Sequence, residues 1–421
     1  MMSGPGRLGV LLASAVALAG CETLLGPGGD GRQPPLDRLP RQLSAEEQAV
    51  IGASNRFAFD ILRETVHDQP AANVLLSPLS ASLALGMTMN GAVGETQDGM
   101  KQALGFGDHD MAGVNEAYRA LIDLLLALDG KVDMRIANSI WARDGFPFHE
   151  SFYDTARRYF DAEVTTMDFS APDAADRIDG WVKQNTGGRI DRIAPRPIPA
   201  LAVMYLVNAI FFKAEWTHRF DPRQTTDSPF RLEDGSTKSV KMMRRTGRLL
   251  HGYDAATGAL VAELPYSRGA YAMTPVLPPA GADMDDFVAS LTEERWNGWL
   301  QGLHEGEATV ALPRFRLEYE TTMNEPLVAL GMDLAFGRRP GTDFSGLSPL
   351  GRELFISLVK QKTFMEVNEE GTEAAAATLV EISRTSGPPA LVFDRPFLLA
   401  VRERLSGTIL FIGRIGDPDS R

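Results

Sequence analysis

The sequence has almost no cysteine and a deficit of positive charge. Cys21 is the only cysteine among its 421 residues, which excludes an intrachain disulfide framework and a cysteine-rich metal site. The 42 Lys and Arg residues are outnumbered by 55 Asp and Glu, and the net charge of −13 opposes binding to nucleic acid through bulk positive charge. The apolar share of 44% is ample for a large core. We therefore expect a globular protein that does not bind nucleic acid.

Motifs for catalysis and metal binding are also missing. The sequence contains no H-E-x-x-H, G-x-x-x-x-G-K or G-x-S-x-G motif, and its six histidines lack metal-ligand spacing. Ser348 comes closest to a nucleophile motif, but Pro349 follows it and spoils the turn. A small basic group is interpreted as a solvated face, with a weak polyanion site as the alternative: Lys241, Arg244, Arg245 and Arg248. The sequence thus predicts a protein that is not an enzyme and has no metal ion or cofactor.

Residues 1–20 have the pattern of a bacterial secretory signal. Arg7 precedes an apolar run over residues 8–19, which is too short to span a bilayer as a stable helix. The run ends in LAGC at 18–21, which resembles a lipobox, where the cysteine is lipidated and the signal is removed; an ordinary signal peptide with a chance cysteine is the alternative. The sequence predicts an exported lipoprotein anchored through Cys21 to the bacterial cell envelope, and Glu22 is compatible with the outer membrane.

A spacer and one folded body follow the anchor. Residues 26–41 hold four Gly and four Pro and almost no apolar side chains, a composition that buries too little surface to fold. We expect residues 21–43 to form a flexible linker. Because no repeat or composition break follows, residues 44–421 are expected to form a single α+β domain.

Hydrophobic patterns and capping residues place helices and strands along this body. Ser44 and Glu47 form a capping-box signature at the first helix. Helices are predicted over 45–66, 78–93, 95–104, 114–128, 150–160 and 174–185. Strands are predicted over 132–141, 201–212, 308–317, 397–401 and 408–415, the last two as a hairpin.

The segment 369–389, EEGTEAAAATLVEISRTSGPP, fits two local structures. Propensity favours a helix, with Thr372 as its cap, four alanines as helix formers and a Gly-Pro stop. The even-numbered positions from 372 to 382 are all uncharged, whereas the odd ones include Glu373 and Glu381. This alternation is typical of a strand that can enter an existing sheet without burying a charge. Both interpretations stay open at this point.

Several stretches, in the right order, resemble the serpin family of serine protease inhibitors. They lie at 73–80, 206–216, 220–222, 312–315, 367–378, 393–397 and 411–414. The resemblance implies a metastable α+β fold with three β-sheets, eight or nine helices and an exposed reactive loop. In that family a serine protease cleaves the loop and is trapped as an acyl-enzyme, because the cut loop inserts into the central sheet.

The resemblance also assigns roles to residues of this chain. The hinge of the loop corresponds to Glu369, Glu370, Gly371, Thr372, Glu373, Ala374, Ala375, Ala376, Ala377 and Thr378. The shutter and breach regions of the central sheet correspond to Ser77, Ser80, Asn208, Trp216, Arg314 and Gln361, with Glu369 expected to pair with Arg314. Gln361 replaces the His found in many members, so we expect a hydrogen-bonded network without His-linked pH dependence.

Family spacing places the scissile bond between Thr385 and Ser386, counted from either Gly371 or Pro396. A threonine there suits elastase-like or subtilisin-like proteases, whereas a bond after Arg384 would suit trypsin-like enzymes. The predicted function is therefore irreversible inhibition of a serine protease by a monomer that touches the membrane only through its lipid. A non-inhibitory binding or scaffold lipoprotein with the same fold is the main alternative, ahead of a surface hydrolase.

Overall fold

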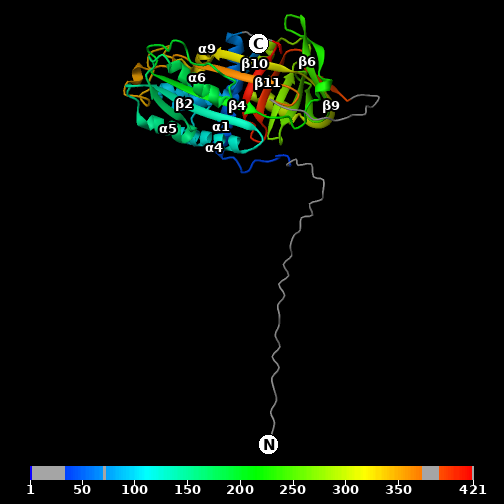
Figure 1. Ribbon diagram of the computed structural model, residues 1–421, viewed down its shortest axis with the longest axis horizontal. Helices are drawn as coiled ribbons and strands as arrows, with labels where there is room; N and C mark the ends of the chain where they lie inside the picture. The colour runs from blue at the N-terminus through cyan, green and yellow to red at the C-terminus, as the bar shows by residue number, and fades with distance from the viewer. Residues whose placement is uncertain (2–33, 70–72, 372–387, 420–421) are drawn as a thin grey trace. The chain divides into compact units, whose positions relative to one another are not determined.

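Nine α-helices lie in the part of the chain described by the computed structural model, which covers Met1 and residues 34–69, 73–371 and 388–419. They are α1 (Ala45–Asp68), α2 (Pro78–Met89), α3 (Glu95–Ala103), α4 (Met111–Ala127), α5 (Glu150–Phe160), α6 (Ala174–Asn185), α7 (Met284–Ala289), α8 (Glu293–Gln301) and α9 (Asn324–Leu327). In Figure 1, α1, α4 and α5 lie together along one side of the body. No helix of these ranges is both long enough and apolar enough to cross a membrane.

Local capping explains where several helices begin and end. The Ser44 hydroxyl accepts from the backbone N–H of Glu47, and the Glu47 carboxylate accepts from the N–H of Ser44, which confirms the predicted capping box. Helix α4 begins earlier than predicted because the Asp110 side chain caps it by accepting from the N–H of Gly113. Helix α2 ends at Met89 and not at residue 93, since the Val93 N–H donates to the Asp343 carbonyl instead.

Fourteen β-strands occur in the same described ranges. They are β1 (Asn73–Leu76), β2 (Asp133–Arg143), β3 (Glu163–Met167), β4 (Met204–Lys213), β5 (Thr226–Arg231), β6 (Thr237–Asp254), β7 (Ala259–Tyr266), β8 (Tyr271–Leu277), β9 (His304–Pro313), β10 (Phe315–Thr322), β11 (Lys360–Val367), β12 (Ala390–Val392), β13 (Phe397–Glu403) and β14 (Ile409–Ile415). The predicted hairpin is confirmed by the antiparallel pairing of β13 with β14.

The prediction of one strand over 308–317 is wrong. The chain turns at Arg314, whose N–H donates to the Lys241 carbonyl, and Pro313 has no N–H with which to continue the ladder. Strand β9 pairs with β6 and β12, whereas β10 pairs with β11 in another sheet. The apolar run therefore contributes to two sheets.

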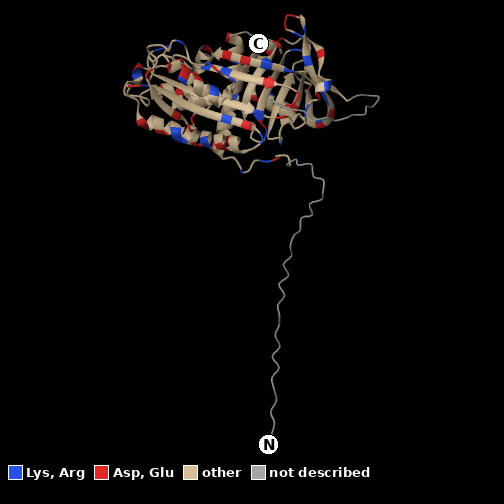
Figure 2. Ribbon diagram, in the orientation of Figure 1, with Lys and Arg blue, Asp and Glu red and all other residues tan. Residues whose placement is uncertain are grey.

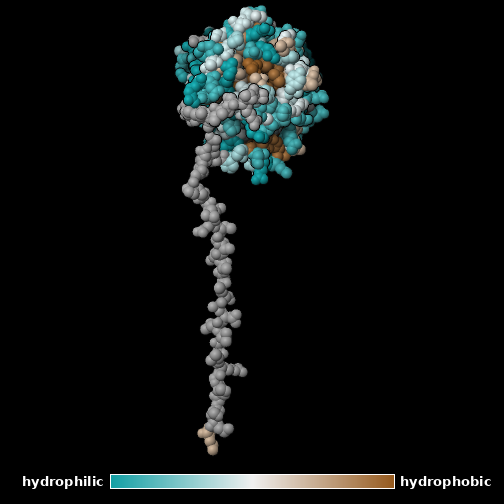
Figure 3. Space-filling model, turned by 90° about the vertical axis from the view of Figure 1, so that its right-hand side faces the viewer, coloured by the Kyte–Doolittle hydropathy of each residue, from teal (hydrophilic) through white to brown (hydrophobic). Residues whose placement is uncertain are grey.

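The strands form three hydrogen-bonded sheets. The largest has the order β1-β14-β13-β8-β7-β6-β9-β12, with β5 paired to β6, and the 18-residue β6 joins its two parts. The other two sheets, β3-β2-β4 and β10-β11, lie side by side in Figure 1. Helix α2 packs against β4 and β14, while α6 packs against β2 and β4 over a separate apolar cluster that includes Trp141, Phe169 and Ile178. Figure 3 shows that the end of the body carrying β6 and β9 is mostly hydrophilic, with two apolar areas.

The compact unit begins at Pro35, earlier than the boundary near residue 44 that composition predicts. Leu36, Leu39 and Leu43 pack against the main core, and the Leu36 N–H donates to the Arg268 carbonyl over 2.8 Å. The boundary lies earlier because these three leucines make apolar contacts with the core, which the average Gly/Pro-rich composition of the segment does not reveal. The last part of the expected linker thus belongs to the folded body.

Candidate functional site

A cleft separates the facing edges of β4 and β11. No ladder pairs these two strands among the residues that the structure describes. The cleft is lined by Thr186, Arg189, Ile190, Ile210, Phe211, Phe212, Lys213, Phe364, Met365, Glu366, Val401 and Phe411. Two strand edges that face each other across a gap offer backbone N–H and C=O groups to an added strand.

One end of this cleft is closed by the residues that follow β11. The N–H of Trp216 donates to the carbonyl of Glu370 over 2.9 Å, and Gly371 forms a β-bridge with Glu215. The indole N–H of Trp216 donates to the Asn368 carbonyl over 2.9 Å, and the ring stacks on Tyr266 with centroids 4.4 Å apart. The start of the predicted hinge is therefore already bonded to the segment that follows β4.

Glu369 lies at this closed end and is only 7% exposed. Its carboxylate accepts a hydrogen bond from the Thr225 hydroxyl over 2.8 Å, whereas the Arg314 guanidinium lies 3.9 Å away with a 55% exposed side chain. The predicted Glu369–Arg314 pair is present at long range, and Thr225 is the closer partner. Sequence reasoning missed Thr225 because nothing in its local pattern marks it as a neighbour of residue 369.

The residues of the predicted shutter connect α2 to both edges of the cleft. On the β11 side, the Gln361 amide N–H donates to the Ser77 carbonyl over 2.8 Å, and its oxygen accepts from the Ser77 N–H over 2.9 Å. On the β4 side, the Ser80 hydroxyl donates to Asn208. The Asn208 amide donates in turn to Asn138 of β2 over 2.7 Å. Neutral amides and hydroxyls make this network, and Asn138 is a member that sequence reasoning missed.

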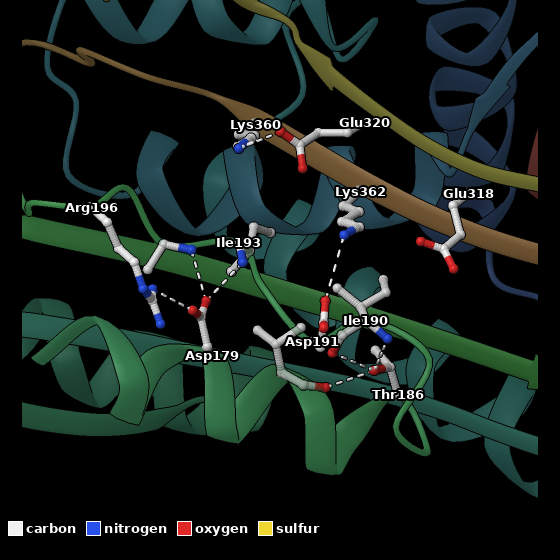
Figure 4. A network of polar contacts seen from close by, with 12 residues as sticks. Asp179, Thr186, Ile190, Asp191, Ile193, Arg196, Glu318, Glu320, Lys360 and Lys362 are labelled. Carbon is white, nitrogen blue, oxygen red and sulfur yellow. Dashed lines mark hydrogen bonds and ion pairs between the residues drawn. The ribbon is translucent and has the colours of Figure 1, made fainter. Parts of the chain in front are cut away.

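The segment that follows α6 covers the cleft, which its residues Thr186, Arg189 and Ile190 line. Figure 4 shows Asp179 of α6 accepting from the N–H of Ile193 and pairing with Arg196. The N–H of Ala194 donates to the same carboxylate, so Asp179 holds this segment against the helix. Asp191 of the segment lies 3.8 Å from the Lys362 ammonium group on β11. The segment thus reaches across the gap from the β4 side to β11.

An aromatic ring strengthens this contact. The guanidinium groups of Arg189, in the covering segment, and Arg316, on β10, lie 5.1 and 5.2 Å from the ring centre of Phe364 on β11. Such cation–π contacts contribute about 0.5–1 kcal/mol each at partly exposed sites. A strand that fills the cleft must displace Arg189, which lines it, and this costs no more than one ladder hydrogen bond of the added strand contributes, about 0.5–1.5 kcal/mol.

Comparison with known proteins agrees with this architecture. The profile of the family described as "Serpin (serine protease inhibitor)" matches residues 52–418. The chain belongs to the serpin family. The leukocyte elastase inhibitor of Sus scrofa is 34% identical over 382 residues, covering 88% of this chain and 100% of the relative. Human neuroserpin is 34% identical over 388 residues, covering 89% of this chain and 92% of the relative.

Solved serpin structures share the fold. Human thyroxine-binding globulin superposes with a TM-score of 0.81 at 28% identity, covering 89% of this chain and 100% of that chain. The thermophilic serpin tengpin in its native state gives a TM-score of 0.79 at 30% identity, covering 92% and 97%. The prediction of the α+β serpin fold is confirmed. Several relatives of this serpin are named as protease inhibitors, and the family is mostly one of inhibitors and not of enzymes.

Charges on this serpin are well mixed, as Figure 2 shows. In the basic group of β6, Lys241 lies 2.9 Å from Asp227, and Arg248 lies 2.9 Å from Glu305. Arg244 donates to the hydroxyl groups of Thr226 and Ser228, so these three members of the group have different local partners. This arrangement favours the solvated-face interpretation over a polyanion site. In the described ranges no three His, Cys, Asp or Glu side chains are grouped as a metal site.

Several predicted residues lie outside the described part of the serpin. These are Cys21, the hinge residues from Thr372 to Thr378, and the candidate scissile-bond residues Arg384, Thr385 and Ser386. Their roles stay predictions. The structure brings together Glu369, Glu370, Gly371 and Trp216 at the closed end of the cleft, and Ser77, Ser80, Asn208 and Gln361 beside its edges.

Proposed function

We propose that this serpin is an irreversible, suicide-substrate inhibitor of serine proteases. The observation that carries the proposal is the cleft between β4 and β11, two strands that no ladder joins within the described ranges. The start of the loop is already bonded at the closed end of this cleft. The alternation of uncharged residues from 372 to 382 supplies a strand that fits such a cleft. An inserted strand would gain ladder hydrogen bonds on both sides, each contributing about 0.5–1.5 kcal/mol.

The chemistry begins as ordinary proteolysis. The protease serine oxygen attacks the carbonyl carbon of Thr385, and its proton passes through the protease histidine to the amine of Ser386, which leaves as the C–N bond breaks. The carbonyl of Thr385 is then an ester of the protease. Insertion of the cut loop between β4 and β11 carries the attached protease away before water hydrolyses that ester. The covering segment after α6 yields during insertion, which breaks the Asp191–Lys362 and Arg189–Phe364 contacts.

An elastase-like or subtilisin-like protease is the proposed target class. Threonine is a small side chain that suits a shallow primary pocket, and several relatives are named leukocyte elastase inhibitors. Trypsin-like targets correspond to the alternative bond after Arg384. We further propose that the chain is an exported lipoprotein held on the outer membrane through Cys21. Cys21→Ala should move the protein from the membrane fraction to the soluble fraction.

The inhibitor proposal is tested by mixing the mature protein with elastase, subtilisin and trypsin. We expect a complex that resists SDS, together with a released fragment that starts at Ser386. A fragment that starts at Thr385 would move the bond to Arg384. Cleavage by all three proteases without any complex would contradict inhibition and favour a non-inhibitory binding protein.

Two matched variants sharpen the test. Residue 376 belongs to the uncharged, even-numbered face of the loop segment, and residue 377 belongs to the odd face that carries Glu373 and Glu381. Ala376→Asp should abolish the complex while leaving cleavage intact, because insertion would bury an unpaired charge. Ala377→Asp should still form the complex. Equal behaviour of the two variants would contradict insertion as an alternating strand.

A further inference from the structure

A pair of histidines, which the proposed inhibition does not use, lies at the end of the ladder between β6 and β9. His251 of β6 is the register partner of His304, the first residue of β9. Residues directly opposite each other on an antiparallel pair point to the same face of the sheet, so their side chains meet. The centres of the two imidazole rings are 4.9 Å apart. Strand pairing thus joins two side chains that lie far apart in the sequence.

A hydrogen bond determines which ring nitrogen of His251 carries the proton. The Nδ1 atom lies 3.3 Å from the Leu249 carbonyl oxygen, which can only accept, so Nδ1 donates. In the neutral imidazole Nε2 then has an unshared electron pair, and within the described ranges no hydrogen bond uses this nitrogen. Histidines that bind metal ions almost always donate their other ring N–H to a carbonyl, a carboxylate or water. The His251 ring is therefore oriented as that of a metal ligand that binds through Nε2.

The backbone of β9 makes room for the His251 ring. His251 is only 9% exposed, and a Cβ added to Gly306 would lie 2.7 Å from its Cε1 and 3.6 Å from its Nε2. The ring thus occupies the space that a side chain at position 306 would need. A ligand group that packing already holds in place loses little further freedom when an ion binds.

His304 supplies the second imidazole. Its side chain is exposed, and in the part of the chain that the structure describes no hydrogen bond or ion pair engages its ring. The ring can therefore turn about its side-chain torsions and direct a nitrogen at an ion bound to His251. With Zn–N bonds of about 2.0–2.1 Å and tetrahedral angles, two imidazoles on one ion have ring centres roughly 5 Å apart. The observed separation of 4.9 Å matches this arrangement.

The nearby acids of β9 do not belong to this pair. Glu305 and Glu307 alternate with His304 along the strand and so point to its other face, where Glu305 pairs with Arg248 over 2.9 Å. We propose that His251 and His304 together bind one divalent transition-metal ion, such as Zn²⁺, whose remaining coordination positions are taken by water. Imidazole suits Zn²⁺, Cu²⁺ and Ni²⁺, whereas Mg²⁺ and Ca²⁺ prefer oxygen ligands.

Calorimetric titration with zinc chloride, in a buffer that does not chelate metal ions, tests this site. The sample is the mature chain, residues 21–421, with Cys21→Ala, so that no thiol supplies a ligand. We expect one saturable Zn²⁺ site per chain and no measurable binding of Mg²⁺. At a free Zn²⁺ concentration of about 100 times the Kd, the melting temperature of the unit Pro35–Arg421 should rise by about 3 °C. The absence of saturable Zn²⁺ binding, or equal affinity for Mg²⁺, would overturn the proposal.

Variants in the same Cys21→Ala background locate the ion at this pair. His304→Ala should weaken Zn²⁺ binding at least about tenfold, because the loss even of a residue that only supports a ligand typically costs about 10–100-fold in affinity. His251→Gln should weaken it as well, and the melting temperature without metal verifies that each variant folds. His109→Ala is the matched control, because His109 is also exposed and precedes α4. If His304→Ala binds Zn²⁺ as tightly as His109→Ala does, the proposal is wrong.

Discussion

Gly371 is the position where the structure makes its sharpest energetic prediction. Its φ of 137° lies in a region that side chains rarely adopt, and a Cβ there would lie 2.3 Å from the Ala214 carbonyl oxygen and 2.5 Å from the Glu215 Cα. Both atoms belong to the backbone that closes the end of the cleft, so neither can move cheaply. Strained backbone costs about 1–3 kcal/mol, and overpacking costs a similar amount. Gly371→Ala should therefore destabilise the intact protein by about 2–6 kcal/mol.

This cost translates into a measurable melting temperature. With an unfolding entropy of about 2.1 cal/mol/K per residue over the unit Pro35–Arg421, the expected decrease is about 3–7 °C. Gly407→Ala is the control, because Gly407 also has a positive φ, of 80°, but nothing lies within 4 Å of an added Cβ. Differential scanning calorimetry compares the two. If Gly371→Ala melts no lower than Gly407→Ala, the described packing of the hinge against Ala214 and Glu215 is wrong.

The remaining predictions concern the shutter, the N-terminal contacts and the covering segment. Gln361→Leu leaves the N–H of buried Ser77 without a partner, while the Ser77 carbonyl still accepts from the Ala81 N–H, and should cost about 1–3 kcal/mol in urea unfolding. An unchanged midpoint would contradict the network. The hydrogen bond from Arg41 lowers the pKa of Glu47 in the folded protein. The ionised Glu47 carboxylate therefore stabilises the fold at pH values above the pKa of the unfolded chain, and this contribution is lost as the pH falls through the lowered pKa of the folded protein. The melting temperature should therefore fall more between pH 5 and pH 3 in the natural protein than in Glu47→Gln, and equal decreases would contradict this linkage. Leu36→Ala should lower the melting temperature, whereas Leu201→Ala should not, because Leu201 is 94% exposed. Lys362→Gln removes the ion pair with Asp191 and should accelerate formation of the SDS-resistant complex. The free energy of unfolding should change by no more than about 1 kcal/mol, because Asp191 is mostly exposed. An unchanged rate would show that this ion pair does not restrain insertion.

The sequence predicted those parts of the fold whose signals are local. The capping box of Ser44 and Glu47 and the bounds of α5 and α6 depend on residues within a few positions of each other, and the structure confirms them. The prediction of one strand over 308–317 was wrong because apolar residues lie on both sides of Arg314, where a hydrogen bond to β6 turns the chain. Hydrophobic periodicity indicates which residues are buried, but it does not indicate which sheet they belong to.

The candidate site depends on contacts between residues far apart in the sequence. Resemblance to the family drew attention to Trp216, which lies at the closed end of the cleft, and to Gln361 on β11, but it did not identify Thr225 as the hydrogen-bond donor to Glu369. Asn138 was missed for the same reason, since a polar residue inside a strand has no local signal for its partner.

The central claim is that the cut loop becomes a strand between β4 and β11. The most direct test is the melting temperature of the protein before and after a single cleavage between residues 372 and 387, made by a protease that is not captured. Insertion adds ladder hydrogen bonds along the facing edges of β4 and β11, so the cleaved protein is expected to melt far above the intact one. A cleaved protein that melts at or below the temperature of the intact protein would contradict the account.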